Sequence, residues 1–160
     1  MSWPELVADH TPLVWRTITR LLDDVSDCED VFQETFAAAV RLDRRETVRS
    51  WPATLTTLAT ARAIDRLRTL RRRRERSAEA DAFAAHGGDP SDRAVATELA
   101  TQLREALATL PAEQAEVFAL ATLSDWSHRK IGERFGKSEN AIAATVSRVR
   151  RHLREVIQDD

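Results

Sequence analysis

Apolar residues recur every three or four positions along most of the chain, which is the spacing of one face of an α-helix. The clearest case lies near the C-terminus, where Ile142, Val146, Val149, Leu153 and Ile157 follow one another at steps of 4, 3, 4 and 4. No segment of the sequence alternates in the manner of a strand. The chain is also rich in Ala, Leu, Arg and Glu, which lose little rotamer freedom in a helix. We therefore predict an all-α fold.

The helical pattern is interrupted at residues 77–92, where a Gly-Gly pair and an Asp-Pro step break any regular element. We predict a flexible linker here. It would join two small helical modules, residues 1–76 and 93–160. The apolar spacing predicts helices at 4–22, 27–42, 46–59 and 60–76 before the linker, with the last two either separate or one bent helix, and at 92–109, 111–123, 128–135 and 139–157 after it.

The formal net charge of −2 conceals two basic segments and one acidic segment. Residues 62–76 hold eight arginines against two acids, residues 148–154 hold four arginines and no acid, and residues 77–92 hold four acids and no base. Dense arginine on one element attracts phosphate regardless of base sequence. Both basic segments are therefore candidate nucleic-acid contacts.

Several classes of protein are disfavoured by what the chain carries. Its single cysteine, Cys28, excludes a disulfide framework and a cysteine zinc cluster, and its four histidines are scattered without metal-ligand spacing. We expect no enzyme and no cofactor. The N-terminus lacks the pattern of a signal peptide, and no apolar run approaches the roughly 20 residues of a membrane helix. We predict a soluble, cytoplasmic protein without membrane insertion.

Residues 127–157 have the pattern of a helix-turn-helix. Ser127 is a predicted N-cap for a short helix that Gly136 ends, and Ser138 is a predicted N-cap for the helix that follows. The last helix buries one apolar stripe and carries arginines on the opposite face, so it can lie in a major groove. An ordinary amphipathic surface helix is the other interpretation, and the pattern alone leaves the two about equal.

Two features of the first module are candidate contact surfaces. Trp51 lies just before the arginine-rich helix, where an exposed aromatic could stack on an unpaired base, although a core position is the more frequent outcome. The helix predicted at 27–42 presents an acidic and amide face with Asp30, Gln33 and Glu34. Such a face is usually only solvated, but it could also hold a protein partner.

Taken together, the motifs resemble the sigma-70 family of RNA polymerase sigma factors. They are DCEDVFQETF at 27–36, AIDRLR at 63–68, LPAEQAEVF at 110–118 and the capped helix-turn-helix. The short chain with two modules resembles the extracytoplasmic-function group of that family. The resemblance covers roughly residues 5–155.

The resemblance implies two tasks for the first module. It would bind the β′ clamp helices of RNA polymerase core through Asp30, Gln33 and Glu34. It would also melt the minus-ten promoter element and capture an unpaired base, with the end of the helix at 46–59, the next helix and the loop between. The residues implied for this second task are Trp51, Arg62, Asp65, Arg66 and Arg68.

The resemblance implies that the second module binds the minus-thirty-five promoter element with its last helix and contacts the β flap with its apolar flank. The residues implied for DNA binding are Arg129, Lys130, Lys137, Asn140, Thr145, Ser147, Arg148 and Arg151. An anti-sigma factor that blocks both modules is a further implied partner.

The chain departs from the family pattern in ways that bear on promoter choice. Ala61 stands where the family commonly has an asparagine, and Trp51 lies about one helical turn farther from Asp65 than usual. Residues 140–145, NAIAAT, stand where the family often has GTVKSR, so three polar or basic base-reading side chains are missing. We expect the last helix to depend more on phosphate contacts, and the first module to carry more of the promoter choice.

Two other functions remain open from the sequence. One is a helix-turn-helix transcriptional regulator that never joins polymerase, and the other is an all-helical protein-interaction adaptor with no DNA role. The segment DCEDVFQETF discriminates against the first, since a regulator has no need of it.

Overall fold

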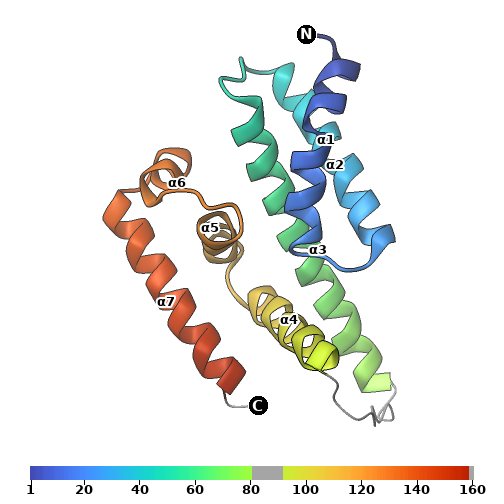
Figure 1. The fold of residues 1–160 in the computed structure, drawn as a ribbon, viewed down its shortest axis with the longest axis vertical. Coiled ribbons are helices and arrows are strands. Elements are labelled where there is room, and N and C mark those ends of the chain that lie inside the picture. Colours follow the sequence, from blue (N-terminus) through green and yellow to red (C-terminus); the bar gives the residue numbers. More distant parts are fainter. Residues whose placement is uncertain (81–91, 159–160) are drawn as a thin grey trace.

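The computed structural model describes residues 1–80 and 92–158. Within these ranges the chain forms α-helices and no strand, so the predicted all-α fold is confirmed. The helices are α1 (Trp3–Thr19), α2 (Val25–Asp43), α3 (Trp51–Ala80), α4 (Asp92–Thr109), α5 (Ala112–Thr122), α6 (His128–Phe135) and α7 (Glu139–Gln158). Figure 1 shows α1, α2 and α3 gathered on one side of the molecule and α5, α6 and α7 on the other. In the described part of the chain, none of the helices combines the length and the apolar character needed to span a bilayer.

Short polar side chains begin the first two helices. Ser2 and Glu5 form a capping box at α1, in which each side chain accepts a hydrogen bond from the backbone N–H of the other residue. At α2 the Asp24 carboxylate accepts a hydrogen bond from the backbone N–H of Asp27. Each cap satisfies a backbone donor that the helix itself leaves unpaired, which typically stabilises a helix by about 1 kcal/mol.

The helix α3 is continuous over 30 residues. The prediction of a helix beginning at 46 is therefore wrong, and of the two alternatives for the third and fourth helices, a single helix is the one found. Residues 44–50 instead form the loop between α2 and α3. Pro52 does not disturb α3, because in the first turn of a helix its missing N–H has no intrahelical partner to lose.

The predicted linker at 77–92 is helical at both of its ends. Residues 77–80 continue α3, and Asp92 begins α4. The helix α3 therefore continues past residue 76. Residues 81–91, and with them the prediction of flexibility, lie outside the described residues.

Buried aliphatic side chains hold each group of helices together. Ile18, Leu55 and Ile64 are fully buried among α1, α2 and α3, and Leu120 and Ile142 are fully buried in the second module. Burying a side chain of this size contributes roughly 1.5–3 kcal/mol. The core of each module is thus built from the apolar stripes that the sequence displays.

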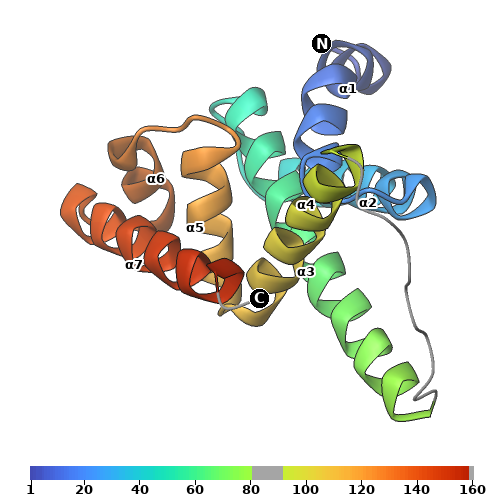
Figure 2. The ribbon, with the colours of Figure 1, turned by 60° about the horizontal axis from the view of Figure 1, so that its bottom comes forward.

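The two modules pack directly against each other through α3. The middle of α3 lies against α4 and α5 in both views of the ribbon (Figure 1 and Figure 2). The buried apolar residues of the two modules form one continuous core. We call the interface between the two modules the seam, and polar contacts cross it. Arg68 donates a hydrogen bond to the Leu110 carbonyl, and Arg20 donates one to the Leu123 carbonyl. Ion pairs of 3.6 Å join Arg104 to Asp23 and Arg74 to Glu105. The chain is therefore closed on itself rather than extended.

Candidate functional site

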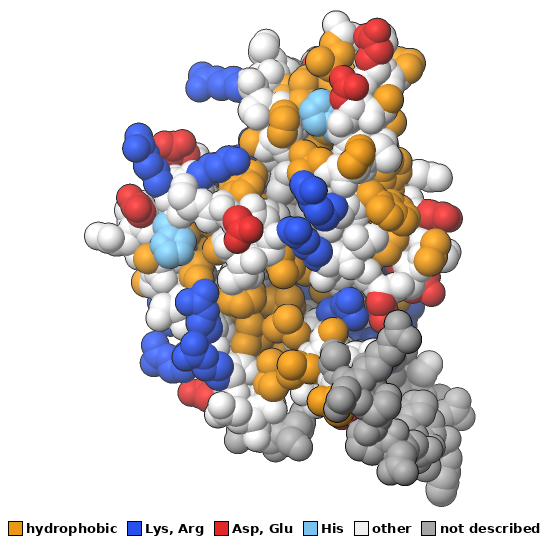
Figure 3. Space-filling view, in the orientation of Figure 1, with side chains coloured by type: hydrophobic (Ala, Val, Ile, Leu, Met, Phe, Trp, Pro, Cys, Tyr) orange, Lys and Arg blue, Asp and Glu red, His pale blue; other side chains and the backbone are white. Residues whose placement is uncertain are grey.

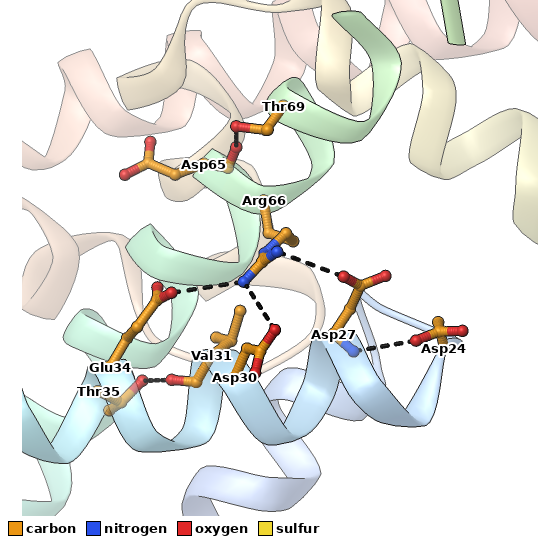
Figure 4. Close-up of polar contacts among 9 residues, drawn as sticks. All are labelled: Asp24, Asp27, Asp30, Val31, Glu34, Thr35, Asp65, Arg66 and Thr69. Atoms are coloured by element: carbon orange, nitrogen blue, oxygen red, sulfur yellow. Dashed lines mark hydrogen bonds and ion pairs between the residues drawn. The ribbon is translucent and has the colours of Figure 1, made fainter. Parts of the chain in front are cut away.

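Three carboxylates lie side by side on α2. Asp27, Asp30 and Glu34 are separated by three and then four residues, the spacing of one helix face. We call these three residues the acidic face of α2. From α3, the guanidinium of Arg66 lies 3.4 Å from a carboxylate oxygen of each (Figure 4). Asp30 and Glu34 remain 56% and 49% exposed, and the neighbouring Gln33 is exposed, so all three residues predicted to bind polymerase are accessible.

The structure groups Asp27 and Arg66 differently from the sequence prediction. The sequence prediction left Asp27 out of the contact surface, although its spacing from Asp30 and Glu34 is the signal that could have found it. Arg66 is predicted among the minus-ten DNA contacts, but its side chain is 16% exposed and lies against α2. Arg66 thus belongs with the acidic face.

Trp51 begins α3 and is half-buried. Its ring packs edge-on against Trp3, with ring centroids 5.4 Å apart and planes at 75°. Part of the ring therefore serves the packing of α1 on α3, and the rest remains accessible.

The remaining predicted minus-ten residues lie along the middle of α3, close to the second module. Arg62 and Arg68 are half-buried and Asp65 is exposed. Arg68 is turned toward the end of α4, where it donates to the Leu110 carbonyl. This part of α3 therefore adjoins the seam between the modules.

Across the seam, Glu116 on α5 carries a perturbed carboxyl group. Partial burial raises the pKa of Glu116, and the negative charges of Asp65 on α3 and Glu113 on α5 raise it further. Two acids from different modules thus oppose each other where α5 packs on α3.

The loop at 44–50 is basic and borders a groove. Arg44, Arg45 and Arg49 are exposed there. Residues 46–50 line a hollow of about 380 Å³ together with the start of α3 and Arg134 of α6. The sequence prediction missed this loop because it placed a helix there. The signal for it is Ser50, whose hydroxyl accepts a hydrogen bond from a backbone N–H in the first turn of α3.

The helix-turn-helix is confirmed at its caps. The Ser127 hydroxyl accepts a hydrogen bond from the Lys130 N–H at 3.1 Å, and the Ser138 hydroxyl accepts one from the Ala141 N–H at 3.1 Å. Gly136 ends α6 in the left-handed conformation, with φ of 65°. These short-range contacts fix the turn between α6 and α7.

Gly132 is a residue of this turn that the sequence prediction did not single out. It is buried in α6, and a Cβ atom built on it would lie 2.5 Å from the backbone oxygen of Lys137. Such a distance is far below van der Waals contact. Only glycine lets the start of α7 approach α6 this closely.

The helix α7 buries its apolar stripe and exposes the opposite face. Ile142, Val146, Val149 and Leu153 are buried as predicted, while Ile157 is half-buried. Figure 3 shows basic side chains gathered over α6 and α7. The predicted DNA-binding residues of this region lie at the surface: Arg129, Lys130, Lys137, Asn140, Ser147, Arg148 and Arg151 are exposed, and Thr145 is half-buried.

Several of these cations already have partners within the chain. The contacts are Arg129 with Glu133 at 3.4 Å, Lys137 with Glu113 at 3.1 Å, Lys130 over the ring of Trp126 at 4.0 Å, and Arg148 donating to the Thr145 hydroxyl at 3.3 Å. Exposed ion pairs of this kind contribute about 0–1 kcal/mol. A phosphate group can therefore displace them at little cost.

Family models match both halves of the chain. The model described as Sigma-70 region 2 matches residues 6–73, and the model described as Sigma-70, region 4 matches residues 100–153. The two matches therefore span α1 to α3 and α4 to α7 in turn.

Curated proteins similar to this chain carry sigma-factor names. The ECF RNA polymerase sigma factor SigE of Mycolicibacterium smegmatis is 27% identical over 158 residues, which are 98% of this chain and 62% of SigE. The ECF RNA polymerase sigma factor SigW of Bacillus subtilis is 25% identical, over 99% of this chain and 90% of SigW. The RNA polymerase sigma factor CarQ of Myxococcus xanthus is 29% identical, over 98% of this chain and 89% of CarQ.

Among solved structures, the chain is similar to the sigma factor RpoE from Bartonella quintana, which was crystallised with the anti-sigma factor NepR. The match has a TM-score of 0.55 and 22% sequence identity, and it covers 99% of this chain and 98% of that one. This likeness supports the fold.

Proposed function

The chain belongs to the sigma-70 family, within its extracytoplasmic-function group, and on this basis we propose that it binds RNA polymerase core and directs promoter recognition and transcription initiation. The observation that carries this proposal is that one chain matches both the region 2 and the region 4 model, in that order. A helix-turn-helix regulator needs only the second match, and an adaptor without a DNA role needs neither. As a sigma factor the chain would act by binding rather than by catalysis, in the cytoplasm alongside polymerase.

In this proposal the acidic face of α2 contacts polymerase. Asp30, Gln33 and Glu34 are accessible and adjacent, which is the arrangement that a shared partner requires. Three carboxylates and the one guanidinium of Arg66 leave this surface with a formal charge of −2. The partner surface should therefore be basic, and the β′ clamp helices are the partner that the family implies.

The helix α7 is proposed to lie in the major groove of the minus-thirty-five element. Asn140, in its first turn, can pair with adenine, which discriminates against other bases by about 1–3 kcal/mol. Arg148 and Arg151 on the exposed face would contact phosphates. The other proposed contacts are Arg129, Lys130, Lys137, Thr145 and Ser147. The apolar flank of the same module would contact the β flap.

The minus-ten element is proposed to meet α3 and the loop before it. The contacts that the family implies are Trp51, Arg62, Asp65, Arg66 and Arg68, and we propose all of them except Arg66, whose side chain lies against α2. To these we add the exposed arginines of the loop at 44–50, of which Arg49 lines the groove at the start of α3. Base stacking on an aromatic ring and arginine–phosphate contacts would offset the few kcal/mol that each unstacked step costs.

Binding of the minus-ten element would require the modules to separate. Arg68 donates to the Leu110 carbonyl, and Asp65 lies near Glu116, so α5 occupies space beside the same part of α3. We propose that the closed arrangement belongs to the protein before it joins polymerase. Contacts with polymerase would then supply the free energy of opening.

An anti-sigma factor is a further proposed partner. The family implies it, and the chain offers apolar surface that a protein partner could cover. Val95 and Leu99, one turn apart on α4, are 52% and 50% exposed.

Run-off transcription with purified core polymerase and a promoter library tests the proposed function. The wild-type chain should give promoter-dependent transcripts. The double variant Asp30→Arg with Glu34→Arg should lose core binding, whereas Glu29→Arg, on the same helix but outside the acidic face, should retain it. If no promoter gives a transcript, the proposal fails. Intact core binding by the double variant would remove α2 from the interface.

A further inference from the structure

Arg66 joins α3 to the acidic face of α2 through three contacts. Its guanidinium lies 3.4 Å from Oδ1 of Asp27, Oδ2 of Asp30 and Oε1 of Glu34, and it donates hydrogen bonds to the last two (Figure 4). The Arg66 side chain is 16% exposed and that of Asp27 is 19% exposed. One largely buried cation therefore bridges three carboxylates on a neighbouring helix, whereas each other ion pair among the described residues joins one cation to one carboxylate.

These contacts make Arg66 a poor ligand for DNA phosphate. To reach a phosphate, it would leave three carboxylates facing one another within two turns of α2. Removing one partner from a partly buried ion pair costs far more than breaking an exposed pair. The acids around it would also repel the phosphate. Arg62, one turn earlier on α3, makes none of these contacts and is not restrained in this way.

We propose that Arg66 is a positioning residue for polymerase binding rather than a promoter contact. It holds Asp30 and Glu34 in the side-chain conformations that polymerase meets. Each of these carboxylates gives one oxygen to Arg66 and, at about half exposure, keeps surface for a partner. This inference rests on the proposed function, in which polymerase core is the partner of α2.

Removing the Arg66 guanidinium has two opposite effects on polymerase binding, one through the charge of the acidic face and one through the positions of its carboxylates. Without Arg66 the acidic face changes from a formal charge of −2 to −3, which strengthens its attraction to a basic partner and speeds association. Without the same guanidinium, Asp30 and Glu34 regain rotamer freedom that binding must then remove, which weakens the complex. A positioning role therefore appears as faster dissociation without slower association.

The test measures association and dissociation rates of the full chain on immobilised RNA polymerase core. We expect Arg66→Ala to dissociate faster, on the order of tenfold, with an association rate equal to or above that of the wild type. Arg66→Lys should recover part of the loss, because an ammonium keeps the charge but cannot span three carboxylates as a planar guanidinium does. Arg71→Ala, which removes the same charge from α3 outside the cluster, should match the wild type.

Circular dichroism and thermal unfolding establish that each variant is folded. If Arg66→Ala does not fold, the dissociation rate of Arg66→Lys is compared with that of the wild type instead. Unchanged dissociation from core would overturn the inference. So would a variant that binds core like the wild type but loses the promoter complex, since that is the behaviour of a DNA contact. Failure of the proposed function is distinguishable, because the wild-type chain itself would then not bind core.

Discussion

Arg68 on α3 donates a hydrogen bond to the backbone carbonyl of Leu110, 42 residues farther along the chain. Leu110 lies between α4 and α5, so this bond ties the long helix of the first module to the bend of the second. The same arginine is among the proposed promoter contacts. Closure of the modules and contact with promoter DNA therefore compete for one side chain.

Weakening the seam should favour the open arrangement. Asp23→Ala with Glu105→Ala removes the ion pairs to Arg104 and Arg74 without touching a proposed DNA or polymerase contact. The Arg74–Glu105 pair is exposed and worth about 0–1 kcal/mol, whereas Arg104 is only 21% exposed and should lose more without Asp23, so we expect at least a few-fold decrease in the closed population. Energy transfer between dyes on cysteines introduced at two exposed positions, one on α2 and one on α7, should fall.

In that measurement Cys28 is replaced by serine, so that dyes attach only at the introduced positions. Glu75→Ala is the matched control, because it removes an i,i+4 pair with Arg71 that lies within α3. Equal energy transfer in the seam variant and in this control would contradict the prediction.

Glu116→Gln should raise the stability of the protein at neutral pH. Burial first, and then the charges of Asp65 and Glu113, raise the pKa of the Glu116 carboxyl in the folded chain. The folded state therefore disfavours the charged form, and the wild type gains stability as pH falls through this raised pKa, in full below the ordinary glutamate pKa. Glutamine avoids this cost at every pH.

Thermal unfolding as a function of pH checks this expectation. The Tm of Glu116→Gln should exceed that of the wild type at neutral pH, by on the order of 2 °C, and the difference should vanish in acid. Glu98→Gln, an exposed site on α4, is the control and should change little. A constant difference at all pH values would point to packing instead of charge.

Arg148→Ala with Arg151→Ala should weaken duplex binding and flatten its salt dependence. If both arginines contact phosphate, the slope of log K against log salt should decrease by roughly one unit for each. Arg150→Ala removes one positive charge from another exposed position of α7, and its slope should change less than half as much as that of the double variant. An unchanged slope in the double variant would mean that these arginines do not meet phosphate.

Gly132→Ala should disrupt the turn between α6 and α7. The new Cβ would lie 2.5 Å from the backbone oxygen of Lys137, which cannot rotate away, so we expect a loss of about 1–3 kcal/mol in the free energy of unfolding. Gly136→Asn is the matched control, because its Cβ would meet nothing within 4 Å and asparagine tolerates a φ of 65°. Urea unfolding that ranks the two variants in the opposite order would contradict this account.

The helix-turn-helix was predictable from sequence because its signals act over short distances. Ser127 and Ser138 each bond a backbone N–H three residues away, and Gly136 only has to adopt one left-handed conformation. The start of α3 was harder to predict. The apolar spacing continues through Val48, whereas the helix begins after the cap at Ser50.

The roles of individual arginines could not be predicted because they depend on packing between distant segments. The motif AIDRLR places Asp65, Arg66 and Arg68 within four residues of one another, and composition treats both arginines alike. In the folded chain Arg66 lies against α2, while Arg68 faces the second module. The packing of α3 between α2 and α5 decides which neighbouring helix each of these arginine side chains contacts.

Because α3 is a single uninterrupted helix, any two of its residues differ in angular position around the helix axis as well as in distance along it. Each residue turns the helix by about 100°, so one residue inserted between Trp51 and Asp65 would swing one of them away from its neighbours. A whole added turn is different, because it restores nearly the same angular position around the helix axis and only shifts the residue about 5.4 Å along that axis. The extra turn that the family resemblance implies between Trp51 and Asp65 would thus be a length change that a continuous helix tolerates. Related chains with an unbroken α3 should vary here in whole turns.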